Sequence, residues 1–385
     1  MGAMRTGRKI SDKQIIWKLP KISLQKMRKY HPTKNVLEAA RERVSMLFDN
    51  FEDISVSISG GKDSSCMYWL FVQEAVKRNR KITAFFQDQE AEYQATVDLI
   101  RVMMKHPNVI PKWYQIPIYL TNATSYDNYF LYAWGEGEQW VREKDPLAIH
   151  AIDEEYPKRF YEFFKWVEKK NTDAAYAVGL RGEEGITRYR AVTKFPGWRG
   201  LKWSTEQEGV KKFYPIFDWT IYDIWKFLYD YNLPYNKIYD LMYMNNYSLY
   251  SKMRVSNLIH EKSYKCLVDL PIYEPDTYDK LCKRISGIAT ASRYASEKVM
   301  FSNRKLPSHY KSWEDFRNFL LENIPTEAHR EAFRKRFEKQ VKNEKTYKAQ
   351  VGSLLLNDFE NSTNKVDNKK DEKLQREKDK WLKIL

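Results

Sequence analysis

The sequence is poor in cysteine and has no long hydrophobic run. Only three cysteines occur among its 385 residues, Cys66, Cys266 and Cys282, and none belongs to a CxxC pair. Neither a disulfide scaffold nor a four-thiolate metal cluster can be built from this chain alone, so we expect a reducing, cytoplasmic setting. No apolar segment approaches the length of a membrane span, so we expect no membrane partner.

Two kinds of sequence pattern are also missing. No segment has the Walker A spacing of a glycine, four residues, then Gly-Lys-Ser or Gly-Lys-Thr. Transfer of a terminal phosphoryl group is therefore not the first expectation. There is no internal repeat of the length that builds a solenoid.

The composition that remains is that of a basic globular protein. Apolar residues make up 43% of the chain and aromatic residues 15%, which is enough to build a core. A net charge of +15 favours anionic partners such as nucleotides, nucleic acid or acidic protein surfaces. A well-solvated basic surface is the alternative, and composition does not separate the two.

The order of expected elements indicates an α/β fold. Strands are predicted at 54–59, 82–88 and 113–120, and helical patterns separate them. Strands that alternate with helices at this spacing favour a doubly wound, mainly parallel sheet. After residue 243 the patterns are mostly helical, which predicts a helical C-terminal region.

Composition shifts divide the chain into regions. From about residue 347 the helical period fades, and the following Asn, Lys, Asp and Glu residues cannot bury enough apolar area to offset chain entropy. The predicted regions are a basic leader (1–32), a nucleotide-binding α/β domain (33–243) with a non-sheet insertion near the site (121–156), a helical region (244–346) and a charged mobile tail (347–385).

A loop rich in glycine and hydroxyl groups joins the first predicted strand to a helix, in the stretch ISVSISGGKDSSCMYWLF. A helix N-terminus offers N–H groups and partial positive charge to a phosphate, and glycines let the backbone approach it closely. A glycine turn before a capped helix explains fewer of these residues. The candidate phosphate-binding residues are Ser59, Gly60, Gly61, Lys62, Asp63, Ser64 and Ser65, with Asp63 also a candidate Mg²⁺ ligand.

The string SGGKDSS resembles the PP-loop of the N-type ATP pyrophosphatase superfamily, and within it the phosphoadenosine phosphosulfate (PAPS) reductase group. Members hold the pyrophosphate of ATP in this loop and cleave between the α- and β-phosphates, often adenylating a substrate. The resemblance implies an adenine nucleotide alpha hydrolase-like fold that binds ATP or a PAPS-like adenine nucleotide with Mg²⁺. It assigns catalytic roles to Lys62 and Asp63.

A second segment carries the same resemblance. GLRGEEGITRYR is similar to the family's Gly-x-Arg-x-x-Glu segment with a following arginine, and it matches at Gly179, Arg181, Glu184 and Arg188. Guanidinium groups can grip phosphate or sulfate through two hydrogen bonds, so catalytic roles for Arg181 and Arg188 and nucleotide contacts for Gly179, Arg181 and Glu184 are implied. Standing alone, the segment would be interpreted as a solvated Glu- and Arg-rich loop.

Two further stretches are similar to the family at other positions. Asp88 in FFQDQEAEY stands where members have an Asp-Thr-Gly-like turn, so it is a candidate nucleotide contact, with an exposed acidic turn as the alternative. The stretch from Tyr214 resembles a Pro, Trp, Asp-Ile-Trp and Pro-Tyr-Asn pattern, which we interpret as packing of the site wall. The matching residues are Pro215, Trp219, Asp223, Ile224, Trp225, Pro234, Tyr235 and Asn236.

One family feature is missing. A working PAPS reductase ends in a Glu-Cys-Gly-x-His-like segment whose cysteine attacks sulfur, and this chain has none. Cys266 and Cys282 lie in predicted helices, where a buried cysteine usually acts as a small hydrophobe, so neither zinc nor an iron–sulfur cluster is expected. The C-terminal region resembles an uncharacterised prophage-associated branch, some of whose members are co-activators found beside ParB-like partners.

Three functional hypotheses follow. The first is an ATP pyrophosphatase or nucleotidyltransferase, plausibly sulfurtransferase-like, that moves AMP to an acceptor and releases pyrophosphate. The second is a nucleotide-dependent regulator that contacts nucleic acid, for which KFPGWRGLKW supplies Trp198, Arg199, Lys202 and Trp203 as base-stacking and phosphate-binding candidates. The third is sulfonucleotide reduction with an external thiol. The acceptor and the oligomeric state stay open at this point.

Overall fold

The structure is a computed structural model that carries side chains. The described residues are 34–125, 128–193, 197–249, 253–296, 303–361, 363 and 366. The predicted basic leader, residues 1–32, lies outside them, as does most of the predicted charged tail beyond residue 361.

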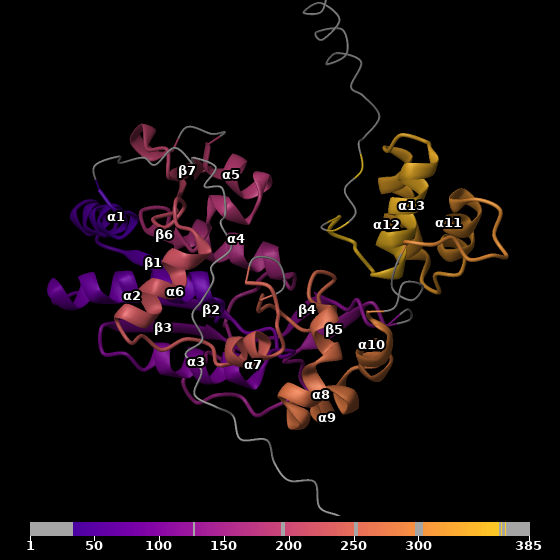
Figure 1. Cartoon of the computed structure of the whole chain (residues 1–385), viewed down its shortest axis with the longest axis horizontal. Helices are drawn as coiled ribbons and strands as arrows, with labels where there is room; N and C mark the ends of the chain where they lie inside the picture. The colour runs from indigo at the N-terminus through magenta and orange to yellow at the C-terminus, as the bar shows by residue number, and fades with distance from the viewer. Residues whose placement is uncertain are drawn as a thin grey trace, which may run out of the picture.

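A six-stranded sheet with the strand order β3-β2-β1-β6-β8-β7 forms the centre of the molecule (Figure 1). Neighbouring strands are parallel except β7, which runs antiparallel to β8 at one edge. The mainly parallel, doubly wound α/β fold expected from the sequence is therefore confirmed. The strands are β1 (Ile54–Ser57), β2 (Ile82–Gln87), β3 (Val109–Tyr114), β6 (Ala175–Val178), β7 (Ser204–Gln207) and β8 (Val210–Phe213).

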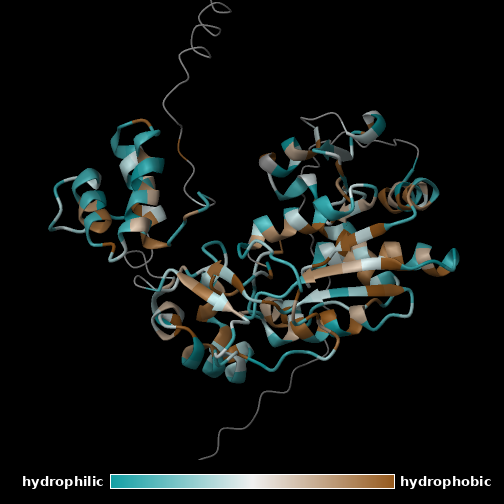
Figure 2. Ribbon diagram, turned by 180° about the vertical axis from the view of Figure 1, so that it is seen from behind, coloured by the Kyte–Doolittle hydropathy of each residue, from teal (hydrophilic) through white to brown (hydrophobic). Residues whose placement is uncertain are grey.

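Helices connect these strands and cover both faces of the sheet. Figure 2 shows the hydrophobic residues gathered on the strands and on the sides of the helices that meet them. The helices of this part are α1 (Val36–Asn50), α2 (Lys62–Lys77), α3 (Gln94–Met104), α4 (Phe160–Lys170), α5 (Ile186–Thr193), α6 (Ile221–Asp230) and α7 (Ile238–Met244), with short 3₁₀ turns η1 (Gly182–Glu184) and η2 (Trp198–Gly200).

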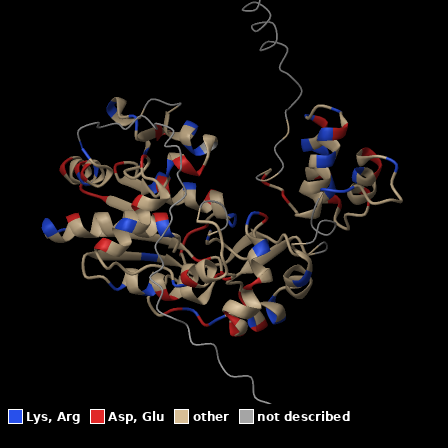
Figure 3. Ribbon diagram, in the orientation of Figure 1, with Lys and Arg blue, Asp and Glu red and all other residues tan. Residues whose placement is uncertain are grey.

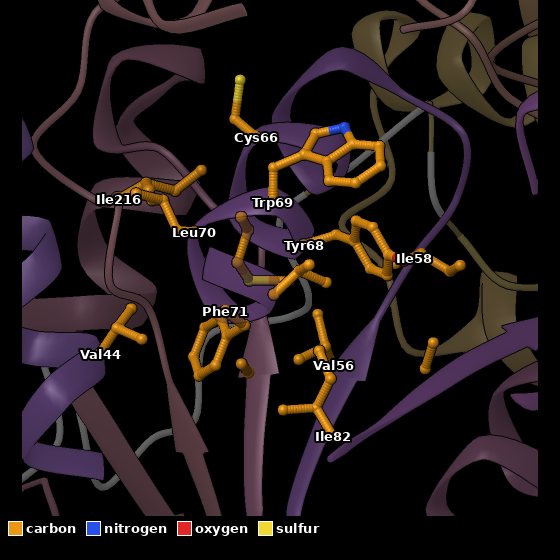
Figure 4. Packing of buried hydrophobic residues seen from close by; sticks show 14 of the residues in the cluster. Val44, Val56, Ile58, Cys66, Tyr68, Trp69, Leu70, Phe71, Ile82 and Ile216 are labelled. Carbon is orange, nitrogen blue, oxygen red and sulfur yellow. The ribbon is translucent and has the colours of Figure 1, made fainter. Parts of the chain in front are cut away.

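Alternation along β1 decides which helix covers which face. Val56 and its apolar neighbours on the same face are buried with side chains of α2 such as Phe71 (Figure 4). Ser57 points to the other face, where it lines a small void together with Phe85 of β2 and Phe164 of α4. Because successive side chains of a strand point to opposite faces, α2 and α4 lie on opposite sides of the sheet.

A small second sheet corrects the expectations for residues 113–156. The predicted strand 113–120 is divided: β3 ends at Tyr114, and β4 (Ile118–Thr121) pairs antiparallel with β5 (Phe130–Ala133). Pro117 lies at the break and lacks the N–H that a continuous ladder needs. The segment 121–156, expected to contain no sheet element, therefore contributes a strand to this β4–β5 hairpin.

The C-terminal part is helical, as the sequence predicts. The helices near the hairpin are η3 (Tyr264–Val268), α8 (Leu270–Tyr273), α9 (Pro275–Arg284) and α10 (Ile288–Tyr294), and the last three are α11 (Trp313–Glu322), α12 (Glu327–Glu338) and α13 (Glu344–Leu355). The last three helices share their own hydrophobic cluster, which includes Tyr129 beside β5. Figure 1 shows them (yellow) set to one side of the central sheet.

Helix α13 corrects the predicted start of the charged tail. Residues 347–355 are helical, and Val351 and Leu354 are buried in the cluster of the last three helices. Beyond the helix, Asn357 Nδ2 donates to Asn122 O at 2.8 Å, which joins the end of the chain to the segment after β4. The short polar residues of this segment hide the apolar helix face, so periodicity alone ends the helical region too early.

The stretch from Tyr214 packs the wall of the sheet, in agreement with its interpretation. Trp219 is 1% exposed and donates through Nε1 to Val36 O at 3.1 Å, which fixes the start of α1. Asp218 accepts two hydrogen bonds from the buried guanidinium of Arg43, at 2.8 and 2.7 Å. This stretch therefore ties α1 to the segment after β8.

Helix α6 begins with a capping box, from which a stability prediction follows. Thr220 Oγ1 accepts from Asp223 N at 3.3 Å, and Asp223 Oδ2 accepts from Thr220 N at 2.7 Å. We expect Thr220→Ala to lower the free energy of unfolding by about 1 kcal/mol, because it removes this cap. Chemical denaturation measures the change, and Thr220→Ser, which keeps the hydroxyl, is the control. A loss equal in both variants would contradict the role of the cap.

The described helices do not have the length and hydropathy of membrane-spanning helices. No helix among the described residues is both long and apolar enough to cross one. Lys and Arg alternate with Asp and Glu over the helices of both parts of the molecule (Figure 3). Residues 1–32 carry nine Lys and Arg residues and one Asp, so about half of the net charge of +15 belongs to the leader. Within the described residues, any special anion site has to be found from local geometry.

Candidate functional site

The loop between β1 and α2 forms one wall of the candidate site. Gly60 has a φ of +66°, and a Cβ on it would lie 2.6 Å from Thr96 Cγ2, so glycine is required here. Helix α2 follows at once with Gly61 as its N-cap, which has no side chain to cap the first turn. N–H groups at an uncapped helix N-terminus, together with the helix dipole, favour an anion at this point.

The three serines of this loop differ in their surroundings. Ser64 Oγ accepts from Ser59 N at 3.2 Å and lies 3.1 Å from Ser59 Oγ. Ser65 Oγ donates to Gly61 O at 2.9 Å, and the side chain of Ser65 is fully buried. Ser64 Oγ also donates to Gly61 O, at 3.0 Å, so Ser64 and Ser65 both hold the loop's own carbonyl, whereas Ser59 lines the cavity beside the loop. Phosphate contacts of Ser64 and Ser65 stay predictions.

Charged side chains from two distant segments meet at the start of α2. Lys62 Nζ lies 3.2 Å from Asp63 Oδ2, and Arg181 Nε donates to Asp63 Oδ1 on the other side of the carboxylate. Arg181 is 4% exposed and Lys62 is 7% exposed, so both cations are held in place by their surroundings. The two segments that carry the family resemblance are therefore parts of one cluster, although they are 118 positions apart.

Arg181 is held from its other side by Glu183. Arg181 Nη1 donates to Glu183 Oε2 at 2.6 Å, and the same oxygen accepts from Ile221 N at the start of α6, at 2.7 Å. Burial alone would lower the pKa of Arg181, but the negative charges and hydrogen bonds of Asp63 and Glu183 raise it above its ordinary value. The guanidinium is a permanent, oriented cation with further N–H donors available to a ligand.

Gly179 explains how closely β6 approaches the loop. A Cβ on Gly179 would lie 2.9 Å from Ser64 Cα, 3.0 Å from Ser64 N and 3.1 Å from Asp63 C. These are backbone atoms of the first turn of α2, which cannot move aside as a flexible side chain can. Gly179 therefore lets the end of β6 pack against the first turn of α2 and brings Arg181 next to Asp63. Its role is packing against the loop backbone instead of direct contact with the ligand.

Glu184 and Arg188 lie outside this buried cluster. Arg188 Nε is 3.8 Å from Glu184 Oε2, and about half of the Arg188 side chain is exposed. Arg188 lines a cavity that opens at the same edge of the sheet, so it can meet a ligand there. Glu184 is the last residue of the turn η1 and faces solvent, where its clearest partner is Arg188.

Asp88 has a structural role that differs from the predicted nucleotide contact. Its side chain is completely buried, and it accepts hydrogen bonds from Trp113 Nε1 at 3.0 Å, from Gln115 Nε2 at 2.9 Å and from Arg142 Nη2 at 2.5 Å. It also accepts from Glu90 N at 2.9 Å. With its oxygens occupied in this way, Asp88 fixes the turn after β2 against the 121–156 segment.

Asn236 and Tyr239 clamp the backbone of the phosphate loop, a role that goes beyond the predicted packing of the site wall. Asn236, which is fully buried, donates through Nδ2 to Gly60 O at 3.2 Å and to Thr96 Oγ1 at 2.8 Å. The hydroxyl of Tyr239 accepts from Lys62 N at 3.1 Å. The Pro-Tyr-Asn string was the signal for this clamp, since Asn236 is its only member with a polar group short and rigid enough to fix a loop backbone.

A cavity of about 350 Å³ lies beside the loop at the carboxyl edge of β1 and β2. This edge is where open α/β sheets bind ligands. Aromatic rings form part of the cavity wall, those of Phe85, Phe86, Tyr119, Phe160, Tyr161 and Phe164. Cationic groups line another part of it, those of Arg159, Arg188, Arg254, His260 and Lys262. The cavity is of the size, and has the aromatic and cationic lining, that suits a nucleotide.

The structure offers Asp63 as a single carboxylate ligand for Mg²⁺. No group of three or more His, Cys, Asp or Glu side chains that could hold a metal occurs within the described ranges. Each Asp63 oxygen already has one partner, and a carboxylate oxygen has a second lone pair to offer. Mg²⁺ usually combines one or two carboxylates with substrate phosphates, so Asp63 fits that role once a nucleotide is bound.

Cys66 and the two tryptophans of the basic aromatic string are buried in the hydrophobic core. Burial raises the pKa of the Cys66 thiol well above its usual value, and Cys66 lies in the hydrophobic core. Trp198 and Trp203 are also buried in that core, where the ring centroid of Trp198 lies 4.9 Å from that of Phe51. The suggestion that these two tryptophans stack on nucleic-acid bases is therefore wrong; residues 194–196 of the string lie outside the described residues.

The family comparison agrees with this geometry. The phosphoadenosine phosphosulfate reductase domain matches residues 53–245, half of the chain. The chain belongs to the PAPS reductase family. A domain of unknown function, DUF3440, matches residues 249–383 and so covers the helical C-terminal part of this family member.

Similar proteins are known at lower similarity. The uncharacterized protein YbdN of Escherichia coli is 29% identical over 310 residues, which is 76% of each chain. FMN adenylyltransferase of Candida glabrata, solved with FMN and an ATP analogue, is 14% identical with a TM-score of 0.34, over 53% of this chain and 58% of that chain. PAPS reductase of Candida auris, solved with phosphate, is 12% identical with a TM-score of 0.33, over 53% and 84%.

Proposed function

We propose that the protein binds ATP, or a closely related adenine nucleotide, and cleaves it between the α- and β-phosphates, transferring AMP to an acceptor. The observation that carries the proposal is the meeting of Lys62, Asp63 and Arg181 at the uncapped N-terminus of α2. A pyrophosphate needs N–H donors and cations at fixed positions, and this cluster supplies both. Membership of the PAPS reductase family supports adenine nucleotide as the ligand class.

The chemistry is an in-line displacement at the α-phosphorus. An acceptor oxygen forms a bond to that phosphorus while the bond to the oxygen bridging the α- and β-phosphates breaks, and the electron pair leaves on pyrophosphate. Lys62 and Arg181 stabilise the negative charge that grows on this leaving group. Mg²⁺, when bound, supplies further charge neutralisation on the phosphate oxygens.

Lys62 provides the test of this proposal. We expect Lys62→Ala to slow pyrophosphate release from α-labelled ATP by about 100-fold or more, because one fixed donor to the leaving group is lost. Lys226→Ala is the matched control, since Lys226 is an exposed lysine in an i,i+4 ion pair on α6. Release of ADP instead of pyrophosphate by the unaltered protein would overturn the proposal, as would full activity of the Lys62 variant.

The cationic wall of the cavity favours an anionic acceptor. Burial lowers the pKa of Lys262, and the positive charges of Arg254 and Arg188 add to this effect, while the negative charges of Glu261 and Asp358 oppose it. Like charges gathered in one place cost energy unless an anion neutralises them. A sulfur oxyanion such as sulfate and the backbone of a nucleic acid both fit, and only the nucleic acid predicts binding that weakens steeply with salt.

A further inference from the structure

Two buried polar side chains, Gln87 and Glu92, line the cavity. Gln87 is the last residue of β2 and is 4% exposed, and within the described ranges neither polar atom of its amide has a hydrogen-bond partner. Glu92 is 3% exposed, and among described residues its carboxyl is influenced only through the charges of Asp88 and Arg142. Buried polar groups are nearly always satisfied, so the unpartnered amide of Gln87 beside a cavity that Glu92 also lines points to a ligand.

The strand register brings Gln87 next to the phosphate loop. Ser57 of β1 is paired with Phe85 of β2, so Ser59 and Gln87 lie two residues further along neighbouring parallel strands. Both line the same cavity, which also contains the ring of Tyr119. A ligand whose phosphates lie over the loop on the α2 side of the sheet can therefore place a flat ring among the aromatic side chains on the α4 side.

We propose that Gln87 and Glu92 form a base-reading subsite that binds the amino edge of adenine. The inference rests on the proposed function and names the residues that select the base. The amide of Gln87 offers one donor and one acceptor, the pattern that pairs with the adenine amino group and a ring nitrogen beside it. A protonated carboxyl offers the same pattern. The amino group has two hydrogens, so both side chains can bind it together.

The surroundings of Glu92 keep it protonated near neutral pH. Burial, reinforced by the charge of Asp88 and opposed by Arg142, raises the pKa of Glu92 to about 8. Across the cavity it faces a mixed set of charged groups, those of Arg159, Arg188, Arg254, His260, Lys262 and Glu360. A purine with an oxo group in place of the amino group reverses the donor and the acceptor, so the amide of Gln87 in the same pose does not pair with it as well. The acid of Glu92 can carry its proton on either oxygen, so it contributes to affinity and leaves the discrimination to Gln87.

Binding of ATP and of inosine triphosphate by the full chain tests the subsite. We expect the unaltered protein to prefer ATP by roughly ten- to a hundredfold, and Gln87→Leu to remove most of that preference. Gln87→Leu should fold at least as stably as the unaltered protein, because it removes a buried unpaired amide. A less stable Gln87→Leu variant with an unchanged ATP preference would overturn the role of Gln87.

Glu92→Gln separates recognition from ionisation. The uncharged amide keeps a donor and an acceptor, so the preference for ATP should remain. In the unaltered protein, ATP affinity should fall about tenfold per pH unit above the Glu92 pKa of about 8, and Glu92→Gln should remove that fall. A fall that persists in the variant belongs to another group, such as Lys262, and would overturn the role of Glu92.

The two levels of the proposal fail in different ways. If neither triphosphate binds, nucleotide binding itself is wrong. If both bind with equal affinity and Gln87→Leu changes neither, the base-reading subsite is wrong while the phosphate site stands.

Discussion

Replacing Arg181 with alanine is expected to slow pyrophosphate release by about a thousandfold and to destabilise the protein by about 3 kcal/mol. The rate falls because Arg181 is a fixed cation beside the leaving group. The stability falls because Asp63 and Glu183 lose a buried partner that holds both of them. Lys62 still contacts Asp63, which places the loss at the low end for a broken buried ion pair.

The shape of the guanidinium can be tested separately from its charge. Arg181→Lys keeps the positive charge but cannot span Asp63 and Glu183, because an ammonium is a single point on a flexible stem. We expect intermediate stability and activity. Arg190→Ala, an exposed arginine on α5 in the same segment, is the control and should change neither. Chemical denaturation and a pyrophosphate assay measure the two effects, and an Arg181→Ala variant that keeps more than a tenth of the activity would exclude the proposed role.

The phosphate loop could be found from the sequence because its function depends on the residue types themselves. Gly60 is needed for backbone shape, Gly61 for the close approach of a phosphate and Lys62 for charge, and all three are adjacent in the chain. Arg181 was identifiable for a similar reason, since it belongs to a short Gly-x-Arg-x-x-Glu string whose guanidinium can grip a phosphate. Local chemistry of this kind is visible without knowledge of the tertiary structure.

The supports of the loop could not be found in the same way. Asn236 reaches Gly60 across 176 positions. The Pro-Tyr-Asn string singles out Asn236, but nothing local to it shows which backbone group it contacts. Asp88 was predicted to contact the nucleotide. Its carboxylate is instead surrounded by donors from β3 and from the 121–156 segment. Both depend on which segments the fold brings together, a property that a single sequence does not contain.

Burial was the other quantity that the sequence left undetermined. Trp198 and Trp203 belong to a basic, aromatic string that is typical of a nucleic-acid contact, yet both rings are in the core. Gln87 looked like an ordinary strand residue and became notable only because its amide is buried without a partner. In both cases the side-chain type stayed the same and its environment decided the interpretation.

Gly179, which packs against the loop, and Gly61, which is part of it, should respond differently to replacement by alanine. Gly179→Ala places a Cβ 2.9 Å from Ser64 Cα, against backbone that cannot yield without moving α2. We expect a loss of about 1–3 kcal/mol in unfolding free energy. Because a shift of about 1 Å misplaces the catalytic groups, pyrophosphate release should also fall by roughly 100-fold.

Gly61→Ala is the matched counterpart, because its backbone and its surroundings accept a side chain. Gly61 has an ordinary φ of −79°, and its Cβ would meet nothing nearer than Ser59 Oγ at 3.4 Å. The variant should be nearly as stable as the unaltered protein, because alanine restricts the unfolded chain but is a poorer N-cap than glycine, and the two effects oppose each other. Nucleotide binding should nevertheless weaken, because the new methyl group occupies the space through which phosphate reaches the backbone N–H groups. Equal losses of stability in both variants would show that Gly61 serves packing, as Gly179 does, and is not kept free for the ligand.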